Sequence, residues 1–138
     1  MPSLNGVLET SLYVDDLDRA SSFYEDLFGL SRIIEGDARL RAYSVGGRSV
    51  LLLFKRGASN CVMQLPLGKM GPHDGSGPLH LAFSISIEDL SGWEKVLAER
   101  GIAVESRVQW PRGGTSLYFR DPDNHLVELA TPGVWSIY

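Results

Sequence analysis

The sequence has little of what several large classes of protein require. Its 138 residues contain one cysteine, Cys61, which excludes an internal disulfide and a zinc site built from several thiolates. The longest hydrophobic run, residues 50–54, is far shorter than the roughly twenty residues of a membrane-spanning helix. Basic residues are outnumbered by acidic ones, 13 to 17, and no basic cluster is longer than Lys55-Arg56. We therefore expect neither nucleic acid nor a membrane as a partner.

The composition is typical of one folded domain. Hydrophobic residues make up 43% and charged residues 22% of the chain, which gives no support to disorder or to a coiled coil. A chain of this length has room for one sizeable core. The first six residues carry neither the basic patch nor the apolar stretch of a secretory signal, so we expect a cytoplasmic protein.

Hydrophobic periodicity predicts a strand and then an amphipathic helix in the first part of the chain. Apolar and polar residues alternate over residues 8–14, which is the period of a half-buried strand. Asp16 is the expected N-cap of the helix, and Gly29 is expected to end it. Two further strands, residues 40–45 and 49–54, are predicted on either side of the turn-forming pair Gly46-Gly47.

The same order of elements returns later in the sequence. Residues 79–85 alternate as a strand, Asp89 is expected to cap a second helix, and Gly101 is expected to end it. Strands are then predicted at residues 102–105, 116–120 and 126–130. The stretch between the two copies, residues 61–78, holds four glycines and three prolines and predicts a linker or an ordered loop.

The repeated order predicts an α+β fold made of two βαβββ modules within one domain, residues 1–138. Module one is expected at about residues 5–56, a Gly/Pro-rich linker at 57–78, module two at 79–131 and a C-terminal tail at 132–138. Two such modules placed side by side would form a cup-shaped, partly open mixed sheet, with the polar strand positions lining the cup. A ligand site is expected there.

Three ionisable residues fall on the polar faces of predicted strands: Glu9, His80 and Glu128. A charged or imidazole side chain beside hydrophobic neighbours is costly to desolvate unless it is paired, hydrogen-bonded or bound to a metal. For each residue alone, a solvated strand face or a hydrogen-bonded core histidine is the simpler interpretation. Glu9 and His80, however, occupy equivalent places in the two modules, which favours a shared site.

Several motifs together resemble the vicinal oxygen chelate superfamily, which includes glyoxalase I, bleomycin-resistance proteins, fosfomycin-resistance enzymes and extradiol dioxygenases. The motifs are Leu12-Tyr13-Val14-Asp15-Asp16-Leu17, His80-Leu81-Ala82-Phe83 and the run of residues 117–129 with its order DPD-x-H-x-x-E. The resemblance implies two βαβββ modules and one divalent metal ion held by Glu9, His80 and Glu128. It also implies a homodimer with sites shared between subunits.

The sequence departs from the well-known members at two ligand positions. Fosfomycin enzymes and dioxygenases usually have histidine where this chain has Glu9, and the place of the fourth ligand of glyoxalase I falls near Leu52. One imidazole and two carboxylates suit Mn, Fe, Co, Ni or Zn without selecting among them.

The function implied by the resemblance is a metal-dependent enzyme of glyoxalase or dioxygenase type. Such an enzyme chelates a small substrate by two adjacent oxygens and stabilises an oxyanion or enediolate. A lyase or isomerase like glyoxalase I is the first expectation and an extradiol-type dioxygenase the second, with Glu128 also acting as the catalytic base. Two alternatives stay open: a metal-free small-molecule binding protein of bleomycin-resistance type, and a fosfomycin-resistance-type transferase.

Four further residues are candidates for substrate binding. Ser11 shares strand parity with Glu9, and Tyr118 lies on its own predicted strand, although both could be ordinary polar strand residues. Trp110 and Arg112 belong to a Gly-containing segment that could cover a substrate and contact an anionic group, or could simply connect two strands. His125 points by parity away from Glu128 and is expected to be structural.

Overall fold

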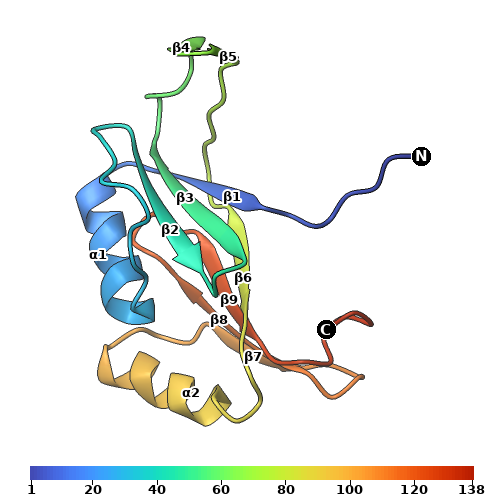
Figure 1. Ribbon diagram of the computed structural model, residues 1–138. Coiled ribbons are helices and arrows are strands. Elements are labelled where there is room, and N and C mark those ends of the chain that lie inside the picture. Colours follow the sequence, from blue (N-terminus) through green and yellow to red (C-terminus); the bar gives the residue numbers. More distant parts are fainter. The chain divides into compact units, whose positions relative to one another are not determined.

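The computed structural model describes all residues, 1–138, and divides the chain into two compact units, Met1–Ser76 and Gly77–Tyr138. Each unit combines one helix with strands of its own (Figure 1), which confirms the predicted α+β class. Neither helix is long and apolar enough to cross a membrane.

The main sheet of the first unit has the strand order β1-β3-β2. The strands are β1 (Glu9–Val14), β2 (Leu40–Val45) and β3 (Ser49–Lys55), and β1 runs parallel to β3 while β2 runs antiparallel to it. The helix α1 (Leu17–Phe28) lies along this sheet (Figure 1). Alternate strand residues and one stripe of the helix form the buried core: Leu12, Val14, Tyr43, Leu51 and Leu53 from the strands, and Leu17, Ala20, Tyr24 and Leu27 from α1.

Helix α1 begins and ends where the sequence predicts. The Asp16 carboxylate accepts a hydrogen bond from the Arg19 backbone amide at 3.0 Å, which satisfies one of the free donors of the first turn. Gly29 has a left-handed φ of 63° and donates its amide to the Glu25 carbonyl. A residue with a Cβ adopts this conformation only at an energetic cost, so the glycine terminates the helix.

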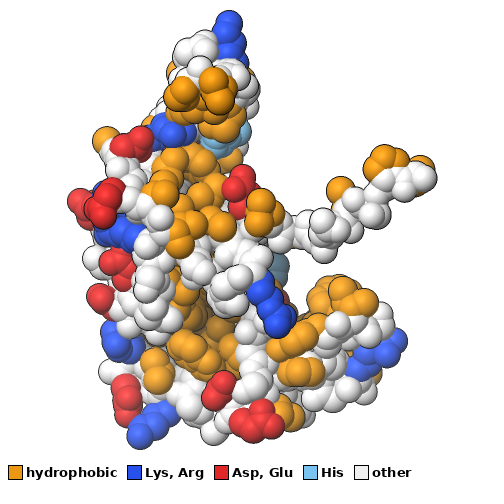
Figure 2. Space-filling view, in the orientation of Figure 1, with side chains coloured by type: hydrophobic (Ala, Val, Ile, Leu, Met, Phe, Trp, Pro, Cys, Tyr) orange, Lys and Arg blue, Asp and Glu red, His pale blue; other side chains and the backbone are white.

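The stretch predicted as a linker contains a two-stranded hairpin, which the sequence pattern did not reveal. Strands β4 (Met63–Leu65) and β5 (Gly68–Met70) pair antiparallel and project beyond the end of β3 (Figure 1). Three residues each are too few for a period of two to stand out in a sequence. Figure 2 shows hydrophobic side chains gathered at this hairpin, where Val62, Leu65 and Leu67 are exposed.

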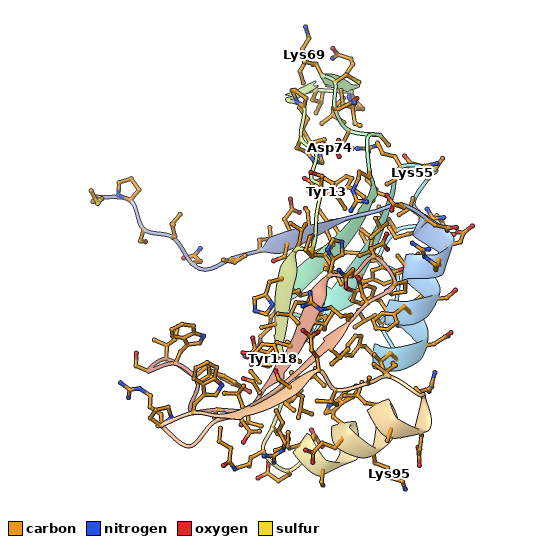
Figure 3. All side chains as sticks on the ribbon, turned by 180° about the vertical axis from the view of Figure 1, so that it is seen from behind. Tyr13, Lys55, Lys69, Asp74, Lys95 and Tyr118 are labelled. Carbon is orange, nitrogen blue, oxygen red and sulfur yellow. The ribbon has the colours of Figure 1, made fainter.

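The segment that returns from the hairpin is fastened to the end of β1. The Tyr13 hydroxyl lies 2.8 Å from Nδ1 of His73, and Asp74 accepts a hydrogen bond from the Gly57 amide at 3.0 Å (Figure 3). Gly75 approaches the Tyr13 ring so closely that a Cβ on Gly75 would lie 2.4 Å from a ring carbon. Residues 73–75 are therefore an anchored part of this unit.

The second unit has the strand order β6-β9-β8-β7. It comprises β6 (His80–Ser84), α2 (Leu90–Glu99), β7 (Ser106–Gln109), β8 (Thr115–Arg120) and β9 (Leu126–Ala130). Its first strand pairs in parallel with its last strand, and the other pairs are antiparallel. The first unit follows this plan in part: β1 pairs in parallel with β3, and β2 pairs antiparallel to it. Its main sheet has three strands, however, so the fourth strand of the predicted βαβββ module is missing there, and an isolated bridge between Arg32 and Tyr43 lies beside β2 instead.

Two local predictions in the second unit need correction. Asp89 precedes α2 as expected, but its side chain makes no capping bond and instead accepts one from the Ser86 hydroxyl at 2.8 Å. The strand predicted at residues 102–105 begins at Ser106. The Ile102 amide still donates to the Leu97 carbonyl, so the chain is completing the end of the helix at this point. Strand pairing starts only when the Glu105 amide reaches the Tyr118 carbonyl at 2.7 Å.

Candidate metal-binding pair in the second unit

Parallel pairing of β6 with β9 brings His80 and Glu128 together. His80 is the first residue of β6 and lies opposite Leu126, while Glu128 lies opposite Ala82. Nε2 of His80 is 3.2 Å from Oε2 of Glu128. The His80 side chain is 51% exposed and that of Glu128 only 7%, so the pair has a buried carboxylate and a ring that solvent reaches.

The hydrogen bond on the other ring nitrogen determines what His80 offers to Glu128. Nδ1 of His80 lies 2.9 Å from the Leu126 carbonyl oxygen, which can only accept, so Nδ1 carries a proton. In the neutral ring, Nε2 then presents a lone pair to Oε2 of Glu128. Two acceptors at 3.2 Å repel each other unless a cation, either a proton or a metal ion, lies between them.

The second carboxylate oxygen of Glu128 has two hydroxyl partners. Oε1 accepts from Ser116 at 2.5 Å and from Tyr118 at 3.1 Å. The Trp110 indole donates to the Ser116 oxygen at 2.8 Å, so the proton of the Ser116 hydroxyl is directed to Glu128. Burial, and then the nearby Glu128 carboxylate, raise the pKa of Tyr118 above its ordinary value, and the phenol therefore keeps the proton that it donates.

This arrangement fits a divalent ion. Nitrogen and oxygen ligands at bond lengths of about 2.0–2.2 Å, separated by angles between tetrahedral and octahedral, lie about 2.8–3.6 Å apart. The observed separation of 3.2 Å falls within this range. Metal-bound histidines typically donate their other N–H to a carbonyl, and ligating carboxylates are typically hydrogen-bonded, as both are here. Neither unit by itself gathers three His, Cys, Asp or Glu side chains into a metal-binding cluster.

Glu9 and Ser11 lie in the first unit. Glu9 is the exposed first residue of β1, as His80 is the first residue of β6, and it pairs in register with Val50. Ser11 is half-buried and pairs with Leu52. Because side chains alternate along a strand, Glu9 and Ser11 share one face of the sheet.

Trp110 and Arg112 lie at the tight connection between β7 and β8. The backbone amides of Trp110 and Gly113 close it by donating to Gly114 and Trp110, at 2.8 and 2.9 Å. Gly114 packs against the tail so closely that a Cβ would lie 2.5 Å from the Gly133 carbonyl carbon. Arg112 is exposed, whereas the Trp110 side chain is joined to Glu128 through Ser116.

Ser116 is absent from the residues that the sequence singles out, although a signal for it exists. Ser116 and Tyr118 are two positions apart on β8 and therefore share a face of the sheet. Tyr118 pairs with Glu128 in the antiparallel register of β8 and β9. Once Tyr118 is a candidate on its predicted strand, the two-residue period of that strand makes Ser116 a candidate on the same face.

Comparisons with known proteins point to one superfamily. Residues 6–129 match the Glyoxalase/Bleomycin resistance protein/Dioxygenase superfamily. The chain is 30% identical over 131 residues to the metallothiol transferase FosB of Bacillus licheniformis, covering 94% of this chain and 77% of that protein. It is 27% identical over 128 residues to the fosfomycin resistance protein FosX of Listeria innocua, covering 91% and 89%.

A similar solved structure covers nearly the whole chain. It is the lactoylglutathione lyase from Agrobacterium tumefaciens, which superposes with a TM-score of 0.88 at 31% identity and covers 98% of this chain and 99% of that one. The match of residues 6–129, the repeated strand-and-helix plan and these relatives agree, and the chain belongs to the Glyoxalase/Bleomycin resistance protein/Dioxygenase superfamily.

Proposed function

We propose that this chain is a divalent-metal-dependent enzyme that joins a thiol to the epoxide of a small antibiotic of the fosfomycin type. The observation that carries the metal is the approach of His80 Nε2 to Glu128 Oε2 at 3.2 Å, while Nδ1 and Oε1 are held by other partners. When bound, a divalent ion would act as a Lewis acid toward two neighbouring oxygens of the substrate.

Glu9 is proposed as the third ligand. It opens the first strand of its unit as His80 opens the first strand of the other, and each of these strands pairs in parallel with the last main strand of its unit. In the superfamily resemblance this position supplies a ligand, and a carboxylate oxygen is a suitable donor for a divalent ion beside an imidazole and a second carboxylate.

The anchoring of Glu128 favours transfer over isomerisation. To take a proton from a substrate carbon, the carboxylate would have to free Oε2 from the ion, and the bonds from Ser116 and Tyr118 to Oε1 restrain it from turning toward the substrate. Hydrogen bonds to a charged group each contribute about 1.5–3 kcal/mol. Opening an epoxide with a thiol needs no such base: a C–S bond forms, a C–O bond breaks, and the proton of the thiol ends on the released oxygen.

The name of one relative, the metallothiol transferase FosB, supports thiol transfer, and the name of the fosfomycin resistance protein FosX supports the antibiotic. The metallothiol transferase FosB and the fosfomycin resistance protein FosX match this chain over more than nine-tenths of its length. In addition, Leu52 occupies the place expected for a fourth ligand in glyoxalase I, and a leucine cannot bind a metal.

A glyoxalase-type lyase is the second candidate. It is favoured by the similarity to the lactoylglutathione lyase structure, with a TM-score of 0.88 over almost the complete chain. In that reaction Glu128 would serve as the base, and its Oε2 would have to leave the ion during each turnover.

The test uses the purified chain loaded with Mn²⁺ and incubated with fosfomycin and either cysteine or glutathione. We expect a thiol adduct by mass spectrometry, and at least about 100-fold less of it with Glu128→Gln. The matched control is Glu99→Gln, on the exposed side of α2. Formation of lactoylglutathione from methylglyoxal and glutathione, without a fosfomycin adduct, would favour the lyase. Failure of the chain to bind any divalent ion would contradict both enzymes and favour a metal-free binding protein.

A further inference from the structure

A buried histidine outside the proposed ligand set holds the chain segment that carries His80. His125 lies in the turn between β8 and β9 and is completely buried. Its Nδ1 accepts the Leu79 backbone N–H at 2.8 Å, so in the neutral ring the proton is on Nε2. Leu79 directly precedes His80.

Residues 125 and 126 together form three hydrogen bonds with residues 79 and 80. The Leu126 amide donates to the Leu79 carbonyl at 2.8 Å, and His80 Nδ1 donates to the Leu126 carbonyl at 2.9 Å. Both backbone polar groups of Leu79 are thereby satisfied by one dipeptide. Leu79, the residue before His80, is therefore held at both its backbone N–H and its backbone carbonyl.

His125 is itself held rigidly. The Asp121 carboxylate accepts from the His125 amide at 2.8 Å and from the Asp123 amide at 2.9 Å, and the Asp121 amide donates to the His125 carbonyl at 3.1 Å. Asn124 takes a left-handed φ of 65°, a conformation that asparagine tolerates better than most residues. The turn is therefore a firm support for the ring.

The backbone before His80 has few other contacts. Residues 71–79 belong to no helix or strand, and the β6–β9 ladder starts only at the pair His80 and Leu126. The His80 side chain is half exposed, and its ring contacts the Leu126 carbonyl, Glu128 and the Tyr118 ring. These contacts orient the ring, while the place of its backbone depends on where the Leu79 peptide lies.

From these contacts we infer that His125 is a positioning residue for His80, acting through its hydrogen bond from the Leu79 amide. This inference rests on the proposed metal site, because its consequence is that losing the acceptor at Nδ1 weakens binding of the divalent ion. Replacement of a residue that orients a metal ligand typically lowers affinity by about 10–100-fold.

A matched pair of substitutions separates this role from simple packing. In His125→Asn the amide oxygen can occupy the place of Nδ1 and accept from Leu79, whereas in His125→Gln the longer side chain puts its amide near Nε2. We expect the Mn²⁺ dissociation constant of the Gln variant to rise by about 10–100-fold and that of the Asn variant to stay within about 3-fold of the unmodified chain. Equal weakening in both variants, or no weakening in the Gln variant, would overturn the inference.

A measurement on the metal-free chain tests the positioning role of His125 independently of the proposed function. In the ¹⁵N-labelled, metal-free chain, the Nδ1–H proton of His80 is expected to exchange slowly with solvent, and to remain slow in His125→Asn but not in His125→Gln. If the unmodified chain binds no divalent ion, the proposed function fails, while this comparison still tests the positioning of His80. Fast exchange in all three proteins, or slow exchange in all three, would overturn the inference.

Discussion

The Ser116 hydroxyl oxygen lies 2.5 Å from Oε1 of Glu128, and both residues are buried. Such a short O–H···O⁻ bond is typical of a charged acceptor held in one orientation. The Trp110 indole completes the arrangement by donating to the same serine oxygen. A buried carboxylate on a central strand is thus oriented by its neighbours on β8 and at the β7–β8 connection.

Replacing Ser116 with alanine is expected to weaken binding of Mn²⁺ by about 10-fold, because Glu128 loses one of two bonds that orient it. Titration calorimetry with the folded variant measures this directly. The control is Ser106→Ala, at an exposed position of the neighbouring strand β7. An unchanged dissociation constant in the Ser116 variant would show that the hydroxyl does not support the site.

Trp110→Phe is expected to weaken Mn²⁺ binding by a few-fold, since the indole acts on Glu128 only through Ser116. Residues in one hydrogen-bond chain have coupled effects. The double variant with Ser116→Ala should therefore bind no more weakly than Ser116→Ala alone. Fully additive losses in this cycle would contradict a role of Trp110 through Ser116.

Much of the fold could be predicted because the chain obeys local rules. The alternation of residues 8–14, the Asp16 cap and Gly29 all gave elements with the observed bounds to within a residue or two. The short β4–β5 hairpin could not be predicted from the sequence. Each of its strands has only three residues, which is too few to show the alternating pattern of a strand. The predicted start of β7 was too early. The Ile102 amide donates to the Leu97 carbonyl at the end of α2, so it is not available for strand pairing.

Part of the candidate site was also open to prediction. Polar strand positions and the family resemblance singled out His80 and Glu128, and Tyr118 was a candidate for substrate binding on its own strand. The structure brings these three residues together around the Glu128 carboxylate. The contributions of Ser116 and His125 depend on pairing register and on which ring nitrogen faces which backbone group. Such contacts join residues twelve or forty-six positions apart, so strand parity can mark Ser116 as a candidate but cannot specify its bond to Glu128.

Glu25 should make the stability of the chain pH-dependent. Burial opposes its ionisation, but hydrogen bonds from Arg32 and Tyr43 outweigh this effect and hold the pKa of Glu25 below its ordinary value of 4.5. A lowered pKa stabilises the folded state above pH 4.5, and this contribution is lost as the pH falls through the folded-state value.

Glu25→Gln is accordingly expected to lower the free energy of unfolding at neutral pH and to differ less from the unmodified chain in acid. Urea denaturation at a series of pH values measures the difference, with the exposed Glu35→Gln as the control. A difference that stays constant from neutral to acidic pH would argue against an ionised Glu25 as its source.

Gly75 should be needed for residues 73–75 to pack against Tyr13. An alanine there would place its Cβ 2.4 Å from the Tyr13 ring, so we expect a loss of about 1–3 kcal/mol in the free energy of unfolding. Gly71→Ala is the matched control, because a Cβ at that position meets no atom within 4 Å. Thermal denaturation of the two variants tests this, and equal stabilities would contradict the close approach.

We propose that Glu9, His80 and Glu128 hold one divalent ion. The most direct measurement is elemental analysis of the purified chain after equilibration with Mn²⁺, Ni²⁺, Fe²⁺ or Zn²⁺ and removal of loosely bound ions, beside the triple variant Glu9→Ala, His80→Ala, Glu128→Ala. We expect about one ion per unmodified chain and none in the folded variant. An unmodified chain that retains no ion, or a triple variant that retains the same amount, would contradict this proposal.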